Sequence, residues 1–281
     1  MTCRSVALVP FAFHAPSGAW VAAHQPPDRR PAAPEVSVAT YNVWFDMTVE
    51  PFTRWAALLA ILERDRPDLL SLQEVTPPFL RLLLSQSWVR DGYVVSHVDE
   101  ASVDPHAAIL LSRYPVLGLQ RIELPSAMGR ALLLGVIDVG GHPLSFGGVH
   151  LESMRESAPT RAAQLAAVIE ALEGPAPAIL AGDLNFCSAD PENQRIVPPW
   201  IDLWSTLRTG DHGWTKDAAR NPMLARRAPF KKRRYDRILA WPAHRLTPVS
   251  IDLLGTEPIE ATDPALRPSD HFGLLGRLAR R

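Results

Sequence analysis

Short apolar runs of strand length recur along the chain, and several of them stop at a polar or acidic residue. In Ile179–Phe186, for example, the apolar run ends at Gly182 and is followed by Asp183 and Asn185. Runs of this length indicate strands that are buried on both faces, and few helical segments separate them. We therefore expect an α+β fold, a four-layer sandwich in which two packed mixed β-sheets are flanked by helices.

Hydrophobic periodicity and turn residues place the individual elements. We expect helices at Pro51–Arg64, Pro77–Ser85 and Arg161–Glu173, the last of them with Thr160 as its N-cap. We expect further strands at Val36–Tyr41, Leu69–Leu72, Gly92–His97, His106–Ser112, Leu117–Glu123, Arg130–Val139, Pro143–His150, Tyr235–Trp241, Pro248–Leu254 and Phe272–Leu278.

The polar residues at the ends of these runs are candidates for a functional site. Taken singly, each is also typical of a turn, a cap or a surface group. Together they indicate a site, because a carboxylate beside a buried run is costly unless it is paired or binds a metal. A two-sheet core would bring such strand ends together at one rim. The candidates are Asn42, Glu74, His150, Asp183, Asn185, Asp236, Asp270 and His271.

These residue types suit the hydrolysis of a phosphodiester. That reaction requires neutralised phosphate oxygens, a water aimed in line and a stabilised leaving oxygen. Mg²⁺ prefers oxygen ligands and needs only one or two carboxylates, for which Glu74 and Asp270 are candidates. Asn42 would be an amide ligand or a neighbour of the ligands. We expect Mg²⁺ as the cofactor, with Mn²⁺ able to replace it.

The remaining candidates would act on the water and the phosphate. Asp183 and Asn185 are two residues apart, so in an extended chain they point to the same face and would orient the attacking water. Asp270 and His271 are adjacent, so one would face the metal while the other faces the phosphate. Asp236 would keep His271 charged and in place.

A basic run precedes Asp236. Residues 216–237 hold nine basic residues against two acidic ones, a local net charge of +7. Such a run is also typical of a solvated face, but near a phosphodiester site it predicts contacts with a nucleic-acid backbone. The candidate substrate-binding residues are Lys231, Lys232, Arg233 and Arg234, with Trp214 as a surface on which an unpaired base would stack.

Composition bounds the domain organisation. Residues 35–281 contain no linker-like gap, and we expect them to form a single domain. Residues 1–34 hold six prolines and are expected to be a poorly ordered leader. A signal peptide is the alternative, since Arg4 precedes the apolar run Val6–Phe13. However, Pro10 breaks that run and no small-residue cleavage site follows.

The same composition bears on location and assembly. The two cysteines, Cys3 and Cys187, lack metal-site spacing and suit a reducing compartment, so we expect a cytoplasmic protein. No apolar stretch of about 18 residues is present, so we expect no membrane span. The net charge is −1, so an anionic partner must be met by a local patch. We expect a monomer.

Six short motifs occur in the order found in the endonuclease/exonuclease/phosphatase superfamily, and the chain resembles that superfamily over Val36–Leu278. The motifs are Thr40–Asn42, Leu72–Val75, Gly148–Ser153, Gly182–Asn185, Tyr235–Ile238 and Ser269–Leu274. Within the superfamily the likeness is closest to the type-2 tyrosyl-DNA phosphodiesterases. It rests on His150–Arg155, on Arg161 with Gln164, and on Pro268–Leu275.

The resemblance implies a DNase I-like sandwich and a Mg²⁺-dependent phosphodiesterase. The resemblance implies that Glu74, with Asn42 and Asp270, holds the metal and that Asp183 and Asn185 position the water. It implies that His271, His150 and Ser153 contact the phosphate and that Asp236 supports His271. Arg155 would be a further substrate contact. The chain departs from the family pattern at Trp44–Asp46, which replaces a shorter turn, and at Leu184, which replaces a threonine.

We therefore expect a phosphodiesterase that acts on DNA, with 5′-tyrosyl adducts as a candidate substrate. One rival is a phospholipid- or phosphoinositide-directed phosphoesterase of the same superfamily. Against it, no apolar surface loop or membrane segment is evident in the sequence. A second rival is a non-catalytic binding protein on the same fold. It is disfavoured because every catalytic-type residue is present.

Overall fold

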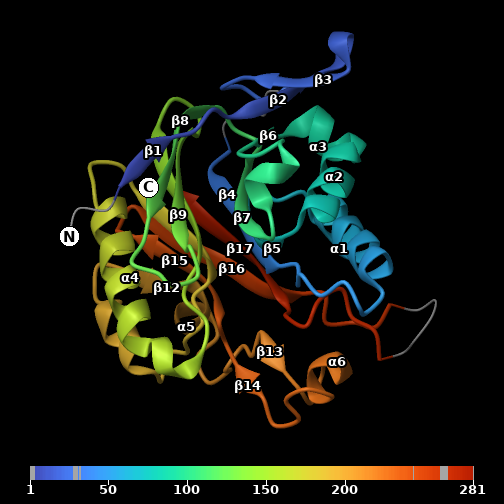
Figure 1. The fold of residues 1–281 in the computed structure, drawn as a ribbon. Coiled ribbons are helices and arrows are strands. Elements are labelled where there is room, and N and C mark those ends of the chain that lie inside the picture. The colour runs from blue at the N-terminus through green and yellow to red at the C-terminus, as the bar shows by residue number, and fades with distance from the viewer. Residues whose placement is uncertain (1–3, 28–30, 32, 243, 260–264, 281) are drawn as a thin grey trace.

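The computed structural model describes residues 4–27, 31, 33–242, 244–259 and 265–280. Its helices are α1 (Pro51–Asp65), α2 (Pro77–Ser85), α3 (Ser87–Gly92), α4 (Ala158–Leu172), α5 (Leu203–Leu207) and α6 (Pro222–Ala225), with 3-10 turns η1 (Ala15–Ser17), η2 (Glu100–Val103), η3 (Arg155–Ser157) and η4 (Pro191–Arg195). Two β-sheets lie between α1, α2 and α3 on one side and α4 on the other (Figure 1). The expected four-layer sandwich is confirmed.

The strands form two large sheets and one short hairpin. The seven-stranded sheet has the order β1 (Ser5–Ala7), β8 (Val116–Glu123), β9 (Ala131–Asp138), β10 (Pro143–His150), β11 (Ala178–Asp183), β15 (Asp236–Trp241) and β12 (Ile201–Asp202). The eight-stranded sheet has the order β16 (Leu246–Leu254), β17 (Gly273–Arg280), β4 (Glu35–Asn42), β5 (Leu69–Val75), β7 (Ala107–Ser112), β6 (Val94–Val95), β2 (Phe11–His14) and β3 (Ala19–Ala22). The hairpin pairs β13 (Lys216–Asp217) with β14 (Lys232–Arg233).

Strand β11 shows why its sequence reads as a continuous apolar run. Ile179 and Ala181 face the core between the two sheets, whereas Ala178 and Leu180 pack in the core beneath α4. Successive side chains of a strand point to opposite faces, so both sets must be apolar when both faces are covered. Burying one such side chain fully contributes about 1.5–3 kcal/mol relative to leaving it exposed.

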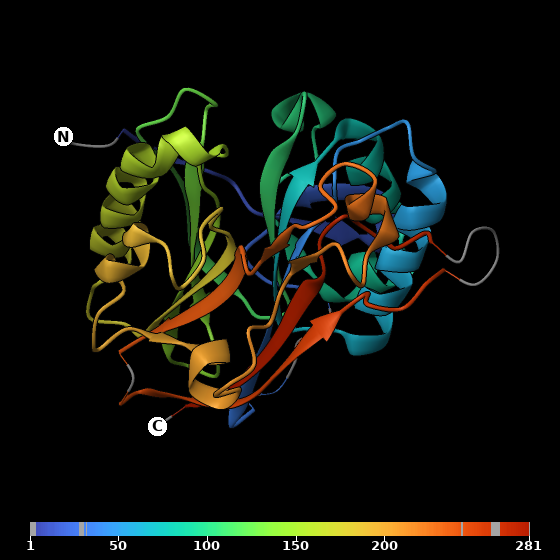
Figure 2. The same cartoon turned by 90° about the horizontal axis from the view of Figure 1, so that it is seen from below.

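The strand topology gathers the candidate residues at one rim. The parallel pairs β4–β5 and β10–β11 end together, and the second pair sets His150 beside Asp183. Strand β15 runs antiparallel to β11, so Asp236 stands at its beginning and pairs with Asp183. His271 likewise precedes a strand, since β17 begins at Gly273. The site is therefore built from the ends of some strands and the beginnings of others. Figure 2 looks onto this rim from below.

Three local predictions are wrong. Residues 4–27 are not poorly ordered, because β1 pairs with β8 and β2 pairs with both β3 and β6, extending both sheets; residues 1–3, 28–30 and 32 of the expected leader lie outside the described part. The strand expected at Gly92–His97 is too long, because Gly92 still belongs to α3 and only Val94–Val95 form a strand, β6. Helix α4 begins earlier than expected, with Ser157 rather than Thr160 at the N-cap, because Pro159 suits a first helical turn.

The described helices include none with both the length and the apolar character needed to cross a membrane.

Candidate active site

The backbone at the rim takes conformations that side-chain-bearing residues seldom adopt. Trp44, Glu74 and Asn185 have φ values of 60°, 59° and 56°. Each such residue costs about 1–3 kcal/mol and persists only where its surroundings hold it. Here the Trp44 N–H donates to Asn42 Oδ1 at 3.0 Å, and the Asn185 N–H donates to Asp183 Oδ1 at 2.9 Å. Asn185 is therefore not in the extended conformation that the sequence reasoning assumed.

Asp183 lies at the centre of the site and is 1% exposed. Its Oδ2 accepts a hydrogen bond from Asn42 Nδ2 at 3.1 Å. The same oxygen lies 3.6 Å from His150 Nε2 and 3.7 Å from His271 Nε2. These two distances exceed a normal hydrogen bond, so neither imidazole is tied to the carboxylate and each Nε2 can hydrogen-bond to an oxygen that lies beside the gap.

The neighbours of Asp183 have structural roles. A Cβ on Gly182 would lie 2.0 Å from the Val149 carbonyl oxygen, so only glycine allows β11 to approach β10 this closely. Leu184 is fully buried and packs with the core beneath α4. The departure from threonine at Leu184 therefore changes the packing under the site and leaves the Asp183 carboxylate in place.

His271 and Asp236 form a buried ion pair. His271 Nδ1 donates to Asp236 Oδ2 at 2.7 Å, and the Asp236 backbone N–H donates to Thr215 Oγ1 at 3.2 Å. Burial alone would lower the pKa of His271, but the Asp236 carboxylate outweighs it and the pKa rises to about 9. His271 is therefore protonated at neutral pH and presents Nε2–H toward Asp183.

His150 has the opposite charge state. Burial and the neighbouring Arg130 guanidinium lower the pKa of His150 well below its ordinary value. Arg130 Nη1 donates to His150 Nδ1 at 3.0 Å, so the single imidazole proton sits on Nε2, which faces Asp183. Arg130 Nη2 also donates to Ser153 Oγ at 3.1 Å, and Asn185 Nδ2 lies 3.4 Å from the same oxygen. These four residues form one network at the phosphate side.

Asp270 and Glu74 form the acidic side of the site. Lys216 Nζ lies 2.8 Å from Asp270 Oδ2. Burial would raise the pKa of the Asp270 carboxyl, but Lys216 and His271 hold it below its usual value. Glu74 accepts hydrogen bonds from Asn42 Nδ2 at 3.0 Å and from the Phe45 N–H at 3.1 Å. Burial first, and the Asp270 charge second, raise the pKa of Glu74.

This acidic side fits a divalent cation. Among the described residues, Asp270 Oδ1 is buried without a hydrogen-bond partner, and Glu74 bears the repulsion of a second carboxylate. A hard cation would satisfy both. Asn42 turns its Nδ2 toward the carboxylates while Trp44 N–H occupies its Oδ1, so Asn42 supports Glu74 rather than offering a ligand oxygen.

A second group of donor atoms also lies close together. Single ligand atoms of Asp183, Asp236 and His271 lie within 4.8 Å of one another. However, Asp236 and His271 bond directly through their facing atoms, and a protonated imidazole cannot bind a metal. Glu74 and Asp270 are therefore the better candidates to hold a cation.

The predicted substrate contacts divide into two groups. Most of them remain accessible: Lys232 and Arg233 are exposed on β14, and Arg155 is exposed on η3. The Lys231 Nζ lies 4.9 Å from the centre of the Tyr235 ring. The half-buried Trp214 stacks on His212 with 4.4 Å between the ring centres. The prediction for Arg234 is wrong. Arg234 is 3% exposed, and its Nη1 lies 2.8 Å from Asp202 Oδ2, which also pairs with the buried Arg237. Arg234 is a structural residue.

This buried cluster yields a stability prediction. Replacing Asp202 with asparagine leaves Arg234 and Arg237 without a charged partner, and breaking a buried pair in this way costs about 3–5 kcal/mol. Urea unfolding should show this loss, whereas Asp138→Asn at a partly exposed turn should change the free energy of unfolding little. Equal stabilities of the two variants would contradict the structural role of Asp202.

The sequence reasoning missed two residues of the site. Arg130 was seen only as the start of a strand, and Lys216 only as one member of a basic run. Neither carries a local signal, because an arginine before a strand and a lysine among arginines are common. Tertiary pairing brings Arg130 to His150 and Lys216 to Asp270.

The chain is similar in sequence to proteins of a known family. Residues 39–271 match the Endonuclease/Exonuclease/phosphatase family. The chain is 31% identical over 223 residues to tyrosyl-DNA phosphodiesterase 2 of Gallus gallus and 34% identical over 227 residues to that of Homo sapiens. Both matches cover 75% of the chain, but they span only 58% and 59% of the two relatives.

Solved structures show the same fold. The crystal structure of D. rerio TDP2 complexed with single-strand DNA product has a TM-score of 0.76 at 26% identity, covering 87% of this chain and 98% of that one. The human Nocturnin catalytic domain, with a bound sulfate anion, has a TM-score of 0.68 at 19% identity, covering 90% and 97% of the two chains. The chain therefore belongs to the endonuclease/exonuclease/phosphatase family of phosphoesterases.

Proposed function

We propose that this protein is a Mg²⁺-dependent phosphodiesterase that hydrolyses DNA phosphodiesters, with 5′-tyrosyl adducts as the leading substrate and their repair as its role. The observation that carries the proposal is the position of Asp183, between one neutral and one protonated histidine, with their Nε2 atoms 3.6 and 3.7 Å from its carboxylate. Relatives named tyrosyl-DNA phosphodiesterase 2, one of them solved with a single-strand DNA product, support the choice of substrate.

The residues divide the reaction between them. Asp183 accepts the proton of the attacking water, and Asn42 holds its carboxylate in place. The water oxygen bonds to phosphorus as the bond to the leaving oxygen breaks, and the leaving oxygen keeps the electron pair. Protonated His271 and neutral His150 donate Nε2–H to the phosphate oxygens. Arg130 adds positive charge on the same side, which stabilises the charge that develops during transfer.

Glu74 and Asp270 would hold the cation, and Mn²⁺ would serve in place of Mg²⁺. When bound, the cation neutralises phosphate charge and polarises the phosphoryl oxygens. Lys216 competes with it for Asp270, since the Lys216 ammonium lies 2.8 Å from that carboxylate. With Asp270 engaged by a cation, the Lys216 ammonium would be available to a phosphate oxygen.

The exposed basic residues of β14 would contact the DNA backbone. Replacing Lys232 and Arg233 with glutamine removes two phosphate contacts. The negative slope of log affinity against log salt concentration for single-stranded DNA should therefore become shallower by about 1.4. Fluorescence anisotropy with the inactive Asp183→Asn protein measures this slope. The matched control replaces the exposed Arg195 and Arg277, and its slope should equal that of the parent. Identical slopes for both double variants would exclude β14 from binding DNA.

A second candidate substrate follows from the surface. The sequence suggested no apolar surface loop, but Phe230 is 95% exposed and Phe45 and Met154 are 47% and 61% exposed on segments next to the site. Such residues would suit insertion into a lipid surface as well as contact with unpaired bases. This observation keeps lipid phosphoesters as the second candidate.

A substrate panel separates the proposals. Purified protein with Mg²⁺ or with EDTA would be given 5′-tyrosyl, abasic and plain single-stranded oligonucleotides, together with sphingomyelin and phosphoinositide vesicles. Fastest Mg²⁺-dependent turnover of the tyrosyl oligonucleotide is the expected result. Faster turnover of a lipid would favour the second candidate, and no Mg²⁺-dependent hydrolysis of any ester would indicate a binding protein.

A further inference from the structure

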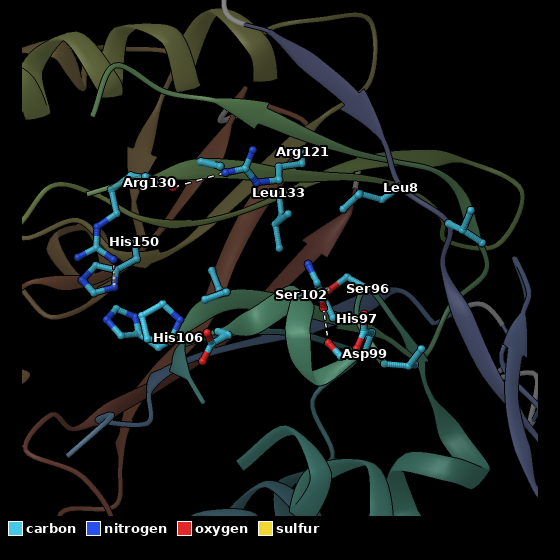
Figure 3. Close-up of a pocket in the computed structure, with 18 of the residues that line it drawn as sticks. Leu8, Ser96, His97, Asp99, Ser102, His106, Arg121, Arg130, Leu133 and His150 are labelled. Carbon is cyan, nitrogen blue, oxygen red and sulfur yellow. Dashed lines mark hydrogen bonds between the residues drawn. The ribbon is translucent and has the colours of Figure 1, made fainter. Parts of the chain in front are cut away.

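A pocket of about 640 Å³ opens beside the active site and runs between the edges of the two sheets. Figure 3 shows Arg130, His150 and His106 gathered at one end and Leu8 at the opposite end. Arg130 and His150 belong to the catalytic network, so the pocket is continuous with the place where the phosphate would bind. Its volume lies within the range of about 300–1,000 Å³ typical of small-ligand sites.

The far wall of the pocket is the N-terminal strap, which we define as residues 5–22. Strand β1 pairs Ser5 with Ile122 on the seven-stranded sheet, and β2 pairs Phe11 with Val95 on the eight-stranded sheet. The strap therefore crosses from one sheet to the other, and the Leu8 N–H donates to the Leu119 carbonyl at 2.9 Å within the crossing. Ala7, Leu8, Val9 and Phe11 all line the pocket.

The strap lies outside the family match, which begins at residue 39. Without residues 7–11, the pocket would lose the wall opposite the catalytic end. With the strap in place, the pocket is closed at its far end, and its volume of about 640 Å³ has room for one small ligand.

The two substituents of a bound phosphodiester would leave the site in different directions. The β13–β14 hairpin pairs Lys216 with Arg233, and Lys216 contacts Asp270. The proposed DNA contacts on β14 therefore lie near the Asp270 and Glu74 carboxylates. The pocket begins instead at Arg130 and His150, on the other side of Asp183. DNA bound along β14 and a group bound in the pocket would thus lie on opposite sides of the phosphate.

The walls of the pocket suit a compact, partly apolar group. Ala108, Ala131 and Leu133 supply apolar surface between the sheets, and Asp99 and Ser96 lie toward the strap (Figure 3). At the catalytic end, His106 stacks on Phe45 with 4.9 Å between ring centres and offers a flat edge. A single aromatic alcohol or a very short peptide fits such a space.

We propose that the pocket receives the leaving group of the ester and that the strap limits its size, so that Leu8 is a specificity-determining residue. The inference rests on the proposed phosphodiesterase function. The enzyme would cleave esters of compact alcohols, such as tyrosine or a short tyrosyl peptide, and would discriminate against an alcohol that continues as a folded protein or a long peptide.

The test compares leaving groups on one oligonucleotide. One substrate carries a 5′-phosphotyrosine, and the other carries the same tyrosine centred in a peptide of about nine residues, which spans ~30 Å when extended. The wild-type protein should show a kcat/KM about 10-fold or more lower for the peptide ester. Leu8→Ala should bring the kcat/KM values of the two esters closer together. Leu8→Trp should increase the difference between them and should also lower turnover of a tyrosyl tripeptide ester.

Val6→Trp is the matched control, because Val6 lies on the same strap, is 39% exposed and does not line the pocket. It should keep the wild-type ratio, and all variants should retain the wild-type Tm within a few degrees. Equal turnover of both esters by the wild type, or equal ratios for Leu8→Trp and Val6→Trp, would overturn the inference while leaving the phosphodiesterase function intact. No turnover of any ester would refute both.

Discussion

Asp183→Asn should lower kcat for phosphodiester hydrolysis by about 10³–10⁴-fold, the upper part of the range for loss of a general base. The amide has nearly the same shape, but it cannot accept the proton of the attacking water. Substrate binding should change little, because the proposed phosphate contacts are those of His150, His271 and Arg130. Steady-state kinetics on a 5′-tyrosyl oligonucleotide, with KM and kcat reported separately, provides the measurement.

The control for this variant is Asp252→Asn, which makes the same chemical change at an exposed carboxylate outside the site. It should retain wild-type kcat. A loss of less than about 10-fold in Asp183→Asn would show that another group activates the water. A matching loss in both variants would point to a general defect of folding.

Glu74→Gln should lower kcat/KM by about 10³-fold, since a bound cation contributes several kcal/mol of transition-state stabilisation. The variant should also require a much higher Mg²⁺ concentration for half-maximal rate, and EDTA should abolish the activity of both proteins. An independent measurement is the Tm. Mg²⁺ should raise the Tm of the wild type through binding to the folded state and should leave that of Glu74→Gln nearly unchanged.

The same substitution should stabilise the metal-free protein. The pKa of Glu74 is raised in the folded state, so its ionised form opposes folding above the unfolded pKa. A neutral amide removes the cost of burying the charge and its repulsion from Asp270, and we expect this gain to outweigh the loss of one of the two hydrogen bonds that the carboxylate accepts. Glu63→Gln, on the exposed face of α1, should change neither activity nor Tm. A metal-free Glu74→Gln protein less stable than the wild type would contradict this account of the acidic side.

The fold was predictable because both of its periodic signals are strong. Helix α1 and strand β10 were predicted to within one residue, since an amphipathic period and a doubly buried run depend on local sequence alone. The strand ends also identified Glu74 and Asp183 as site candidates. Their geometry was not predictable, because the left-handed backbone of Glu74 and Asn185 comes with side-chain hydrogen bonds to residues distant in sequence, Asn42 for Glu74 and Leu151 for Asn185.

Charge was the least reliable guide. The basic run predicted that Arg234 faces substrate, yet the structure uses it to neutralise Asp202, while Lys216 of the same run reaches the catalytic carboxylates. Counting charged residues gives the net charge but does not show which of them form buried salt bridges. The strap was missed because its prolines suggested disorder, whereas Pro10 lies between β1 and β2 and Pro16 lies in η1, so neither interrupts a strand.

The hydrogen bond between Asn42 and Asp183 joins the two sheets, since Asn42 ends β4 and Asp183 ends β11. A sideways slip of one sheet by about 1 Å would break this 3.1 Å bond, and displacements of that size can cost 10²-fold in rate. The proposed catalysis thus depends on the position of one sheet relative to the other. Interior residues such as Phe146 and Leu274, which never touch substrate, act as the spacers that keep the two halves in register.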